Sequence, residues 1–263
     1  MILGAAKSGT TSLAKYLSVH PDIALLPNKE IHYFDWRYDH TYQWYEDQFK
    51  SHKKYMVDAT PYYLFHPLIP SRVKAYNPDC KFIILLRDPA DRAVSHYFHN
   101  MKIKNMKDRE LSHWREFLPL DEELPIKDAF RMEEERIKDQ YELVQENAED
   151  KTYHNHILQH YSYKARGHYA EQLKRWFKIF PKENFLIVDF YDLTNTPDNV
   201  LKKVYAFLNI KVVMPHKFDN FNQGSYAINK DVQDVINELR VYYAPYDHDL
   251  FDLTQIRFEW MKN

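Results

Sequence analysis

The N-terminal stretch MILGAAKSGTT, residues 1–11, decides the fold. Its apolar start breaks at Gly4, after which Leu13 and Leu17 recur at helical spacing. This order predicts a short strand, a loop and a helix whose N-terminal amides can bind an anion. The 263-residue chain has only four glycines, and Gly4 and Gly9 flank this loop. We therefore expect the loop backbone to approach another group closely.

The lysine of this loop lies in an unusual place for a phosphate-binding loop. In the nucleoside-triphosphate pattern G-x-x-x-x-G-K-[ST] the lysine follows the second glycine, whereas here Thr10 follows Gly9 and the lysine is Lys7. A lysine inside the loop points at a bridging or leaving-group oxygen. The alternative interpretation is a tight strand-to-helix turn with a surface lysine.

Further apolar runs predict a parallel sheet. Lys81 to Leu86 (KFIILL) and Phe185 to Val188 (FLIV) are typical of strands covered on both faces, and Tyr55 to Val57 is a weaker candidate. Helices are expected to alternate with them: one opened by Pro89, then Asp128 to Glu149, Tyr163 to Phe180, Asp198 to Leu208 behind Pro197, and Asp231 to Tyr243 closed by Pro245. The sequence thus predicts one α/β domain over residues 1–263, with a central parallel β-sheet flanked by helices and a ligand crevice at the carboxyl ends of the strands.

Composition excludes several classes of protein. The formal net charge is -2, so no basic excess favours a nucleic acid or an anionic membrane as partner. Cys80 is the single cysteine, which excludes an intramolecular disulfide and favours a reducing compartment. No apolar run has the length of a membrane span. We expect a soluble cytoplasmic protein, with its oligomeric state left open.

Three segments resemble sulfotransferases that use 3′-phosphoadenosine 5′-phosphosulfate (PAPS). The Gly4 to Thr11 loop looks like their 5′-phosphosulfate loop. Lys29 to Trp36 (KEIHYFDW) is similar to the K-E-x-H-[FY]-F-D stretch of carbohydrate sulfotransferases, particularly the heparan sulfate glucosaminyl 3-O- and N-sulfotransferase group. Arg87 to Tyr97 (RDPADRAVSHY) resembles their strand, loop and helix around the 3′-phosphate of the cofactor. The resemblance covers nearly the whole chain and implies a P-loop-like domain.

The chemistry of the third segment agrees with an anion site. Arg87 directly follows the KFIILL run, at the carboxyl end of a strand, where a guanidinium can grip a phosphate with two parallel hydrogen bonds. Ser95 lies about two turns into the following helix and can donate to the same phosphate. The alternative is a strand-end salt bridge from Arg87 to Asp88 or Asp91.

The resemblance also implies roles for the other site residues. Lys7 would stabilise the leaving oxygen as 3′,5′-adenosine diphosphate departs, and Ser8, Gly9, Thr10 and Thr11 would hold the 5′-phosphate. Glu30 occupies the position of the family's catalytic carboxylate and would be the general base. His32, on the same side if this stretch is extended, would assist it, bind the acceptor or replace it as base. No metal is required.

Two segments depart from the heparan-type pattern. Ala59 replaces the lysine before the Thr60-Pro61 pair, so one cation of that site is missing. A Lys-Gly-Arg triplet is replaced by Gln223, Gly224 and Ser225, whose amides and hydroxyls would have to bind phosphate. With one cysteine and no membrane segment, the chain is more consistent with a microbial or viral cytosolic relative than with an animal Golgi enzyme.

These observations lead to one predicted function and two rivals. The prediction is a PAPS-dependent sulfotransferase that moves a sulfuryl group to a hydroxyl, or alternatively an amine, of a glycan or small-molecule acceptor. A nucleotide or small-molecule kinase is the enzymatic rival, and the absence of lysine at position 10 argues against it. The other rival is a nucleotide-binding scaffold without turnover, which would lack a base, whereas Lys7, Glu30 and His32 are all present.

Overall fold

The computed structural model describes residues 1–27, 30–105, 124–219 and 226–262. The chain divides into two compact units, which are described separately. Unit 1 comprises Met1–Arg87, Glu171–Gln223 and Arg257–Asn263, and unit 2 comprises Asp88–Ala170 and Gly224–Ile256. The assignment of a single domain to residues 1–263 stays a prediction.

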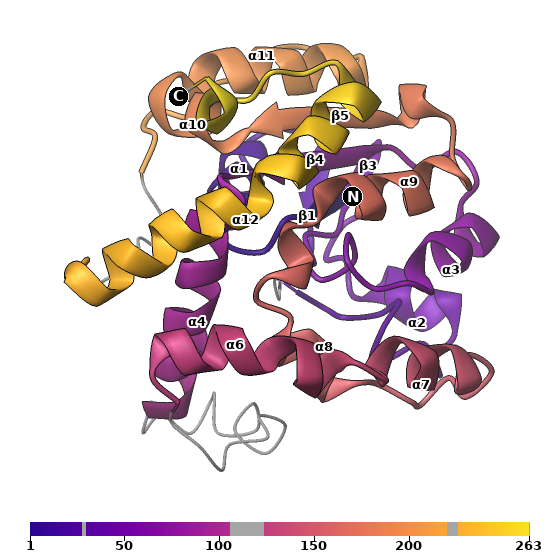
Figure 1. The fold of residues 1–263 in the computed structure, drawn as a ribbon. Helices are drawn as coiled ribbons and strands as arrows, with labels where there is room; N and C mark the ends of the chain where they lie inside the picture. The colour runs from indigo at the N-terminus through magenta and orange to yellow at the C-terminus, as the bar shows by residue number, and fades with distance from the viewer. Residues whose placement is uncertain (28–29, 106–123, 220–225, 263) are drawn as a thin grey trace. The chain divides into compact units, whose positions relative to one another are not determined.

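Unit 1 is built on parallel strands (Figure 1). Its main sheet has the order β1-β4-β5, with β1 at Ile2–Gly4, β4 at Phe82–Leu86 and β5 at Phe185–Asp189. A second sheet pairs β2 (Ile23–Leu25) with β3 (Tyr55–Val57), also in parallel. The N–H of Ile2 donates to the carbonyl of Asp58 at 2.8 Å, which connects the end of β3 to β1. The predicted α/β fold with a parallel sheet is therefore confirmed, and β2 is an addition to it.

Helices cover both faces of the main sheet, as the buried strands require. Ile83 and Leu85 pack in one apolar cluster with α1 (Thr10–Leu17) and α11 (Pro197–Leu208). Phe82 lies on the opposite face of β4. The centroid of its ring is 5.0 Å from that of Trp176 in α9 (Tyr169–Phe177). The other elements of unit 1 are α2 (Tyr42–Asp47), α3 (Ile69–Tyr76), η3 (Lys182–Asn184), α10 (Phe190–Asn195) and η4 (Glu259–Met261).

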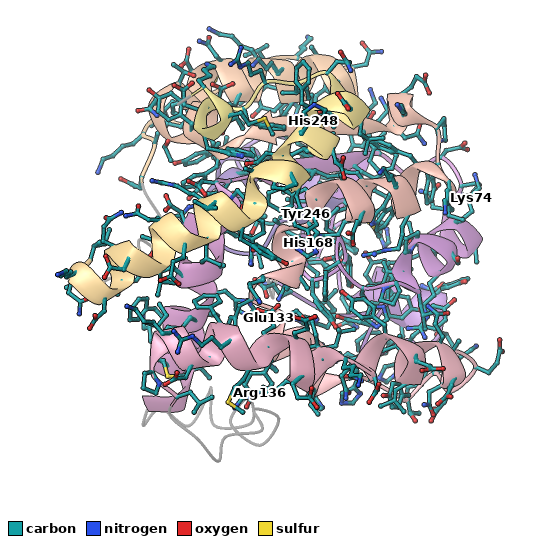
Figure 2. The ribbon with its side chains drawn as sticks, in the orientation of Figure 1. Lys74, Glu133, Arg136, His168, Tyr246 and His248 are labelled. Carbon is teal, nitrogen blue, oxygen red and sulfur yellow. The ribbon has the colours of Figure 1, made fainter. Side chains whose placement is uncertain are left out.

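Unit 2 is helical in its described part. Its elements are α4 (Pro89–Asn105), α6 (Ile126–Ile137), α7 (Gln140–Glu146), α8 (His156–Tyr161), η2 (Ala165–Gly167) and α12 (Lys230–Thr254). The buried side of α12 packs against α4 and α6. The rings of His168 and Tyr246 stack 4.0 Å apart beside η2, and Glu133 of α6 is buried (Figure 2).

Three predicted helix boundaries are wrong. The segment 128–149 forms two helices, α6 and α7, because the second half buries only Val144 and has no apolar stripe to continue the first. The helix predicted from Tyr163 begins at Tyr169, because Glu133 accepts hydrogen bonds from the N–H groups of Lys164 and Ala165 and holds a separate 3-10 turn there.

The third wrong boundary is Pro245, which lies inside α12. Proline removes the hydrogen bond to the carbonyl four residues earlier. That residue is Val241, which is 78% exposed, so water can satisfy its carbonyl. Tyr243 and Leu250 are buried on either side of the proline and stabilise a continuous helix. The start of α11 at Pro197 is as predicted.

Among the described residues, every helix is either too short or too polar to span a lipid bilayer.

Candidate active site

The loop between β1 and α1 is tightly packed against other parts of unit 1. The N–H of Ala5 donates to the carbonyl of Leu85 at 2.7 Å, which fixes the loop to the end of β4. Gly9 precedes α1 with φ 81°, a conformation that favours glycine. A Cβ at Gly9 would lie 2.9 Å from the side chain of Leu193 in α10. The expected close approach of the backbone is therefore present, and the neighbouring group is a protein side chain.

Arg87 lies beside this loop, at the carboxyl end of β4. Its Nη1 donates to the carbonyl of Lys7 at 3.2 Å, and its guanidinium lies 5.1 Å from the ring centroid of Phe190. The structure thus brings together Lys7 and Arg87, two cationic residues predicted from separate motifs. Asp88 and Asp91, the acids considered as alternative partners of Arg87, contact Arg240 of unit 2 at 2.9 and 3.5 Å.

The loop has the donors that an anionic ligand needs. Ser8 is fully buried, and its Oγ has no hydrogen-bond partner among the described residues. A buried hydroxyl without a partner is costly unless a ligand or water satisfies it. Thr10 is buried and Thr11 is half-buried at the start of α1, where main-chain N–H groups are free of helical partners. Together with Arg87, this set of donors fits a phosphate or sulfate group.

Glu30 and His32 follow β2, and their side chains face each other. Oε2 of Glu30 lies 3.9 Å from Nε2 of His32. Their backbone is not extended as expected, because φ is 65° at Glu30 and 54° at His32. The His32 side chain is 3% exposed and that of Glu30 is 37% exposed, so the carboxylate is the member of the pair that solvent can reach.

Asp35, for which the sequence predicted no role, completes this group. Nδ1 of His32 donates to Oδ2 of Asp35 at 2.7 Å, and Asp35 is buried. The ring of Trp36 stacks on His32 with centroids 4.0 Å apart. The i, i+3 spacing of His32 and Asp35 was visible in the sequence, but their contact depends on the unusual backbone at His32.

The protonation of this group follows from its environment. Burial alone would lower the pKa of His32, but Asp35, Glu30 and Asp58 raise it above its usual value. Burial would raise the pKa of Asp35, but the charge and hydrogen bond of His32 hold it below its usual value. Asp35 is therefore ionised and keeps a proton on Nδ1 of His32, which leaves Nε2 to exchange a proton on the side of Glu30.

A second buried carboxylate, Asp58, lies at the end of β3. It accepts hydrogen bonds from Thr60 at 2.6 Å and Tyr45 at 3.0 Å. Burial raises its pKa, although both hydroxyl donors counteract that effect. Ala59, which replaces the lysine of the resembling family, is 2% exposed within the apolar core.

Four further predicted residues remain. Ser95 lies in α4 of unit 2 and is 6% exposed, so its share in binding the same phosphate as Arg87 stays a prediction. Gln223, Gly224 and Ser225 lie outside the described residues.

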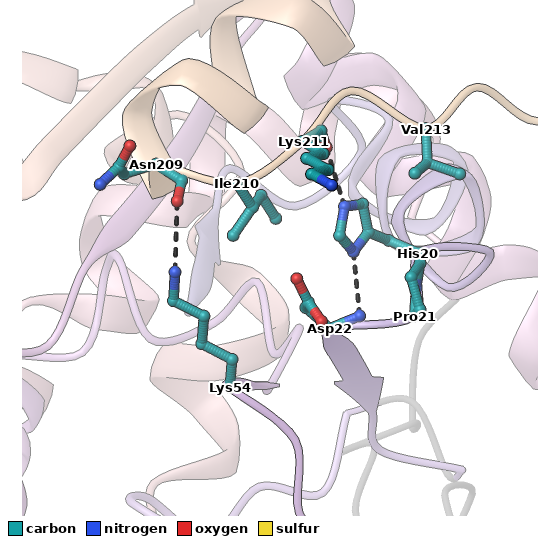
Figure 3. Close-up of a pocket in the computed structure, with 8 residues that line it drawn as sticks. All are labelled: His20, Pro21, Asp22, Lys54, Asn209, Ile210, Lys211 and Val213. Atoms are coloured by element: carbon teal, nitrogen blue, oxygen red, sulfur yellow. Dashed lines mark hydrogen bonds between the residues drawn. The ribbon is translucent and has the colours of Figure 1, made fainter.

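A cavity of about 590 Å³ in unit 1 contains none of the predicted site residues (Figure 3). It lies at the amino ends of β2 and β3, because Asp22 and Lys54 in its wall directly precede these strands. His20 is fixed there by hydrogen bonds to Lys211 and Asp22. Ligands of parallel sheets bind at the opposite, carboxyl ends.

Known proteins are similar to this chain in fold and in sequence. The sulfotransferase domain family matches residues 1–238. A crystal structure of a sulfotransferase from Alicyclobacillus acidocaldarius superimposes with a TM-score of 0.74 at 27% identity, covering 100% of this chain and 97% of that one. The membrane-associated sulfotransferase kil1 of Dictyostelium discoideum is 26% identical over an alignment of 313 positions that covers 99% of this chain and 66% of the relative. Heparan sulfate glucosamine 3-O-sulfotransferase 3B1 of Mus musculus is 26% identical over an alignment of 285 positions that covers 99% of this chain and 64% of the relative.

The parallel sheet, with a tight loop and a helix after its first strand, defines the fold as α/β of the P-loop-like kind. The chain belongs to the sulfotransferase domain family. It spans less than two thirds of the length of the two curated relatives described above.

Proposed function

We propose that the protein is a sulfotransferase that takes a sulfuryl group from PAPS and transfers it to a hydroxyl of a glycan or small-molecule acceptor, with an amine as the alternative acceptor group. The observation that carries the proposal is the contact between Arg87 and the carbonyl of Lys7, which joins the strand-end guanidinium to the lysine of the loop. Family membership supports sulfuryl transfer rather than phosphoryl transfer.

The donor fits the residues around this contact. Ser8 Oγ and the amides of Gly9, Thr10 and Thr11 would hold the 5′-phosphate, and Arg87 would hold the 3′-phosphate. Ser95, Gln223, Gly224 and Ser225 remain proposed cofactor contacts. When bound, PAPS supplies the sulfuryl group and leaves as 3′,5′-adenosine diphosphate.

Lys7 has an electrostatic role in this proposal. Its ammonium group stabilises the negative charge that develops on the bridging oxygen as the bond to sulfur breaks. A fixed positive charge does this without reorganisation of solvent, so it acts most strongly in the transition state.

Glu30 is the proposed general base. Its carboxylate is accessible and accepts the proton of the acceptor hydroxyl, while His32, oriented by Asp35, lies behind it with Nε2 facing the carboxylate. A protonated His32 pairs with Glu30 and favours the ionised form of its carboxylate, which is the form that can accept a proton. The same geometry allows the alternative in which Nε2 of His32 takes the proton and Asp35 orients the ring.

Incubation of the protein with sulfur-labelled PAPS and a panel of glycans, phenols and alkyl alcohols tests the proposal. Labelled product with at least one hydroxyl acceptor supports it. Transfer of phosphate from ATP to the same panel, with no transfer from PAPS, would contradict it.

A further inference from the structure

We propose that Arg72, a residue remote from the loop motifs, is the positioning residue that holds His32 and Asp35 in their working geometry. Arg72 belongs to α3 and is 7% exposed. The inference rests on the proposed function only for its effect on turnover, because its structural part concerns the protein without any ligand.

The contact that carries the inference is made to the peptide backbone between the two residues. Nη1 of Arg72 donates to the carbonyl of Phe34 at 2.8 Å. The N–H of Phe34 donates to the hydroxyl of Tyr63 at 3.2 Å. Both polar groups of Phe34 are therefore bound by buried side chains, and Phe34 lies between His32 and Asp35 in the chain.

The backbone of this segment needs such external support. Glu30 and His32 both have positive φ, which L residues with side chains adopt only at an energetic cost. A conformation of this kind persists only when surrounding contacts determine it. Arg37 adds a hydrogen bond to the carbonyl of Ile31, and Arg72 supports the other side of the His32 turn.

Arg72 is itself rigid, as a positioning residue must be. Its guanidinium lies 4.4 Å from the ring centroid of Tyr38, and its side chain is buried among unit 1 residues. A lysine at this position would keep the charge but lose the planar donor group and its stacking.

If Arg72 acts through its charge, replacing it should change the pKa of His32 in one direction. If Arg72 acts by positioning, the change should be in the opposite direction. The charged groups around His32 are Glu30, Asp35 and Asp58, and those around Asp35 include His66 as well as His32. Arg72 has Tyr38 and Asp35 as its charged or titratable neighbours, and its positive charge also acts on His66. Removing a nearby positive charge would raise the pKa of an imidazole, whereas loosening the contact with Asp35 would lower it.

The test is NMR titration of His32 in the whole 263-residue chain labelled with ¹⁵N-histidine, comparing wild type, Arg72→Met and Arg72→Lys. We expect both variants to lower the pKa of His32, by about one unit, because neither has the planar, stacked guanidinium that holds the carbonyl of Phe34. A rise in Arg72→Met with no change in Arg72→Lys would mean that Arg72 acts by charge alone. No change in either variant would also overturn the proposal.

Two further variants serve as comparison. Lys74→Met removes a positive charge from an exposed position of the same helix and should leave the titration of His32 unchanged. Tyr63→Phe removes the acceptor of the Phe34 N–H and should shift the pKa of His32 in the same direction as Arg72→Met. This variant keeps the proposal falsifiable if Arg72→Met does not fold, and an unshifted titration in Tyr63→Phe and Arg72→Lys would then refute it.

The effect on turnover separates this inference from the proposed function. Once an acceptor is identified, Arg72→Lys should lower kcat by up to about 10²-fold, because a misplaced reacting group costs a factor of that size. The affinity for 3′,5′-adenosine diphosphate should change little. Because the proposed mechanism uses protonated His32 beside Glu30, the alkaline limb of the kcat profile should move to lower pH with the pKa of His32. If no acceptor is ever sulfated but the NMR shifts occur, the proposed function fails and the positioning role stands.

Discussion

Nδ1 of His32 lies 2.7 Å from the carboxylate of Asp35, while its other ring nitrogen faces Glu30 at 3.9 Å. The imidazole therefore bridges two carboxylates, one buried and one accessible. Because Asp35 retains the proton on Nδ1, only Nε2 can change its protonation during a reaction. This relationship allows the roles of Glu30 and His32 to be separated experimentally.

Glu30→Gln keeps the size of the side chain and removes its basicity. We expect turnover to fall by roughly 10² to 10⁴, the range for loss of a general base, with the affinity for 3′,5′-adenosine diphosphate nearly unchanged. His32→Asn should lose less activity. Steady-state kinetics and calorimetry on both variants measure these effects. An inactive His32→Asn beside an active Glu30→Gln would reverse the assignment of the base.

Lys7→Ala tests the electrostatic role of the loop lysine. Since its charge is needed most when the leaving oxygen becomes negative, kcat should fall by about 10² to 10³ while the Kd of the donor product changes much less. Measured kcat, KM and Kd distinguish the possibilities. A normal kcat with a raised KM would instead assign Lys7 to binding of the ground state.

Arg87→Ala tests the 3′-phosphate site. The wild-type protein should bind 3′,5′-adenosine diphosphate more tightly than 5′-AMP, and the variant should lose on the order of 1.5 to 3 kcal/mol for the diphosphate only. Isothermal calorimetry with both nucleotides gives this comparison, and Arg257→Ala, at an exposed arginine of unit 1, is the matched control. An equal loss of binding free energy for both nucleotides would mean that Arg87 binds the 5′-phosphate, which both of them carry.

Glu133 gives unit 2 a pH-dependent stability. Burial raises the pKa of Glu133 from 4.5 to about 7, although the N–H groups of Ala165 and Lys164 counteract this. The folded state therefore holds this proton more tightly than the unfolded state. The resulting stability is fully present below pH 4.5 and is lost as pH rises through about 7, a change of about 3 kcal/mol.

Glu133→Gln should make the free energy of unfolding less dependent on pH over that interval, because the titrating group is gone. Denaturant unfolding of both proteins at pH 4.5 to 8 measures the difference. An identical pH profile for the two proteins would show that another group carries the dependence.

Much of unit 1 could be predicted from sequence because its strands are local apolar runs. The KFIILL and FLIV runs became β4 and β5, and the glycines at 4 and 9 marked the loop. β2 was missed because Ile23–Leu25 is only three residues long and follows Pro21 and Asp22, which indicate a turn. The end of α12 was misjudged because the burial of Leu250 outweighs the effect of Pro245.

The geometry around His32 could not be predicted in the same way. The placement of Glu30 and His32 on the same side assumed an extended stretch, but φ is positive at both residues. Positive φ is uncommon for any residue other than glycine, so the sequence alone did not indicate it. The support comes from Arg72 and Tyr63, which are 38 and 29 residues away from Phe34 in the chain. Contacts at such separations depend on the assembled unit.

The discontinuous order of unit 1 has a consequence for how the protein folds. Met1 and Lys81, hydrogen-bonded to each other beside β1 and β4, are 80 residues apart, and Asn184 before β5 reaches Cys80 across 104 residues. Contacts of such long range cost loop-closure entropy before they contribute stability, so folding should be slow for a chain of this size. The part of unit 2 from Asp88 to Ala170 is synthesised before β5 emerges. A nascent chain or fragment that ends before Phe185 therefore lacks one side of the sheet that supports the loop, and it should not retain 3′,5′-adenosine diphosphate.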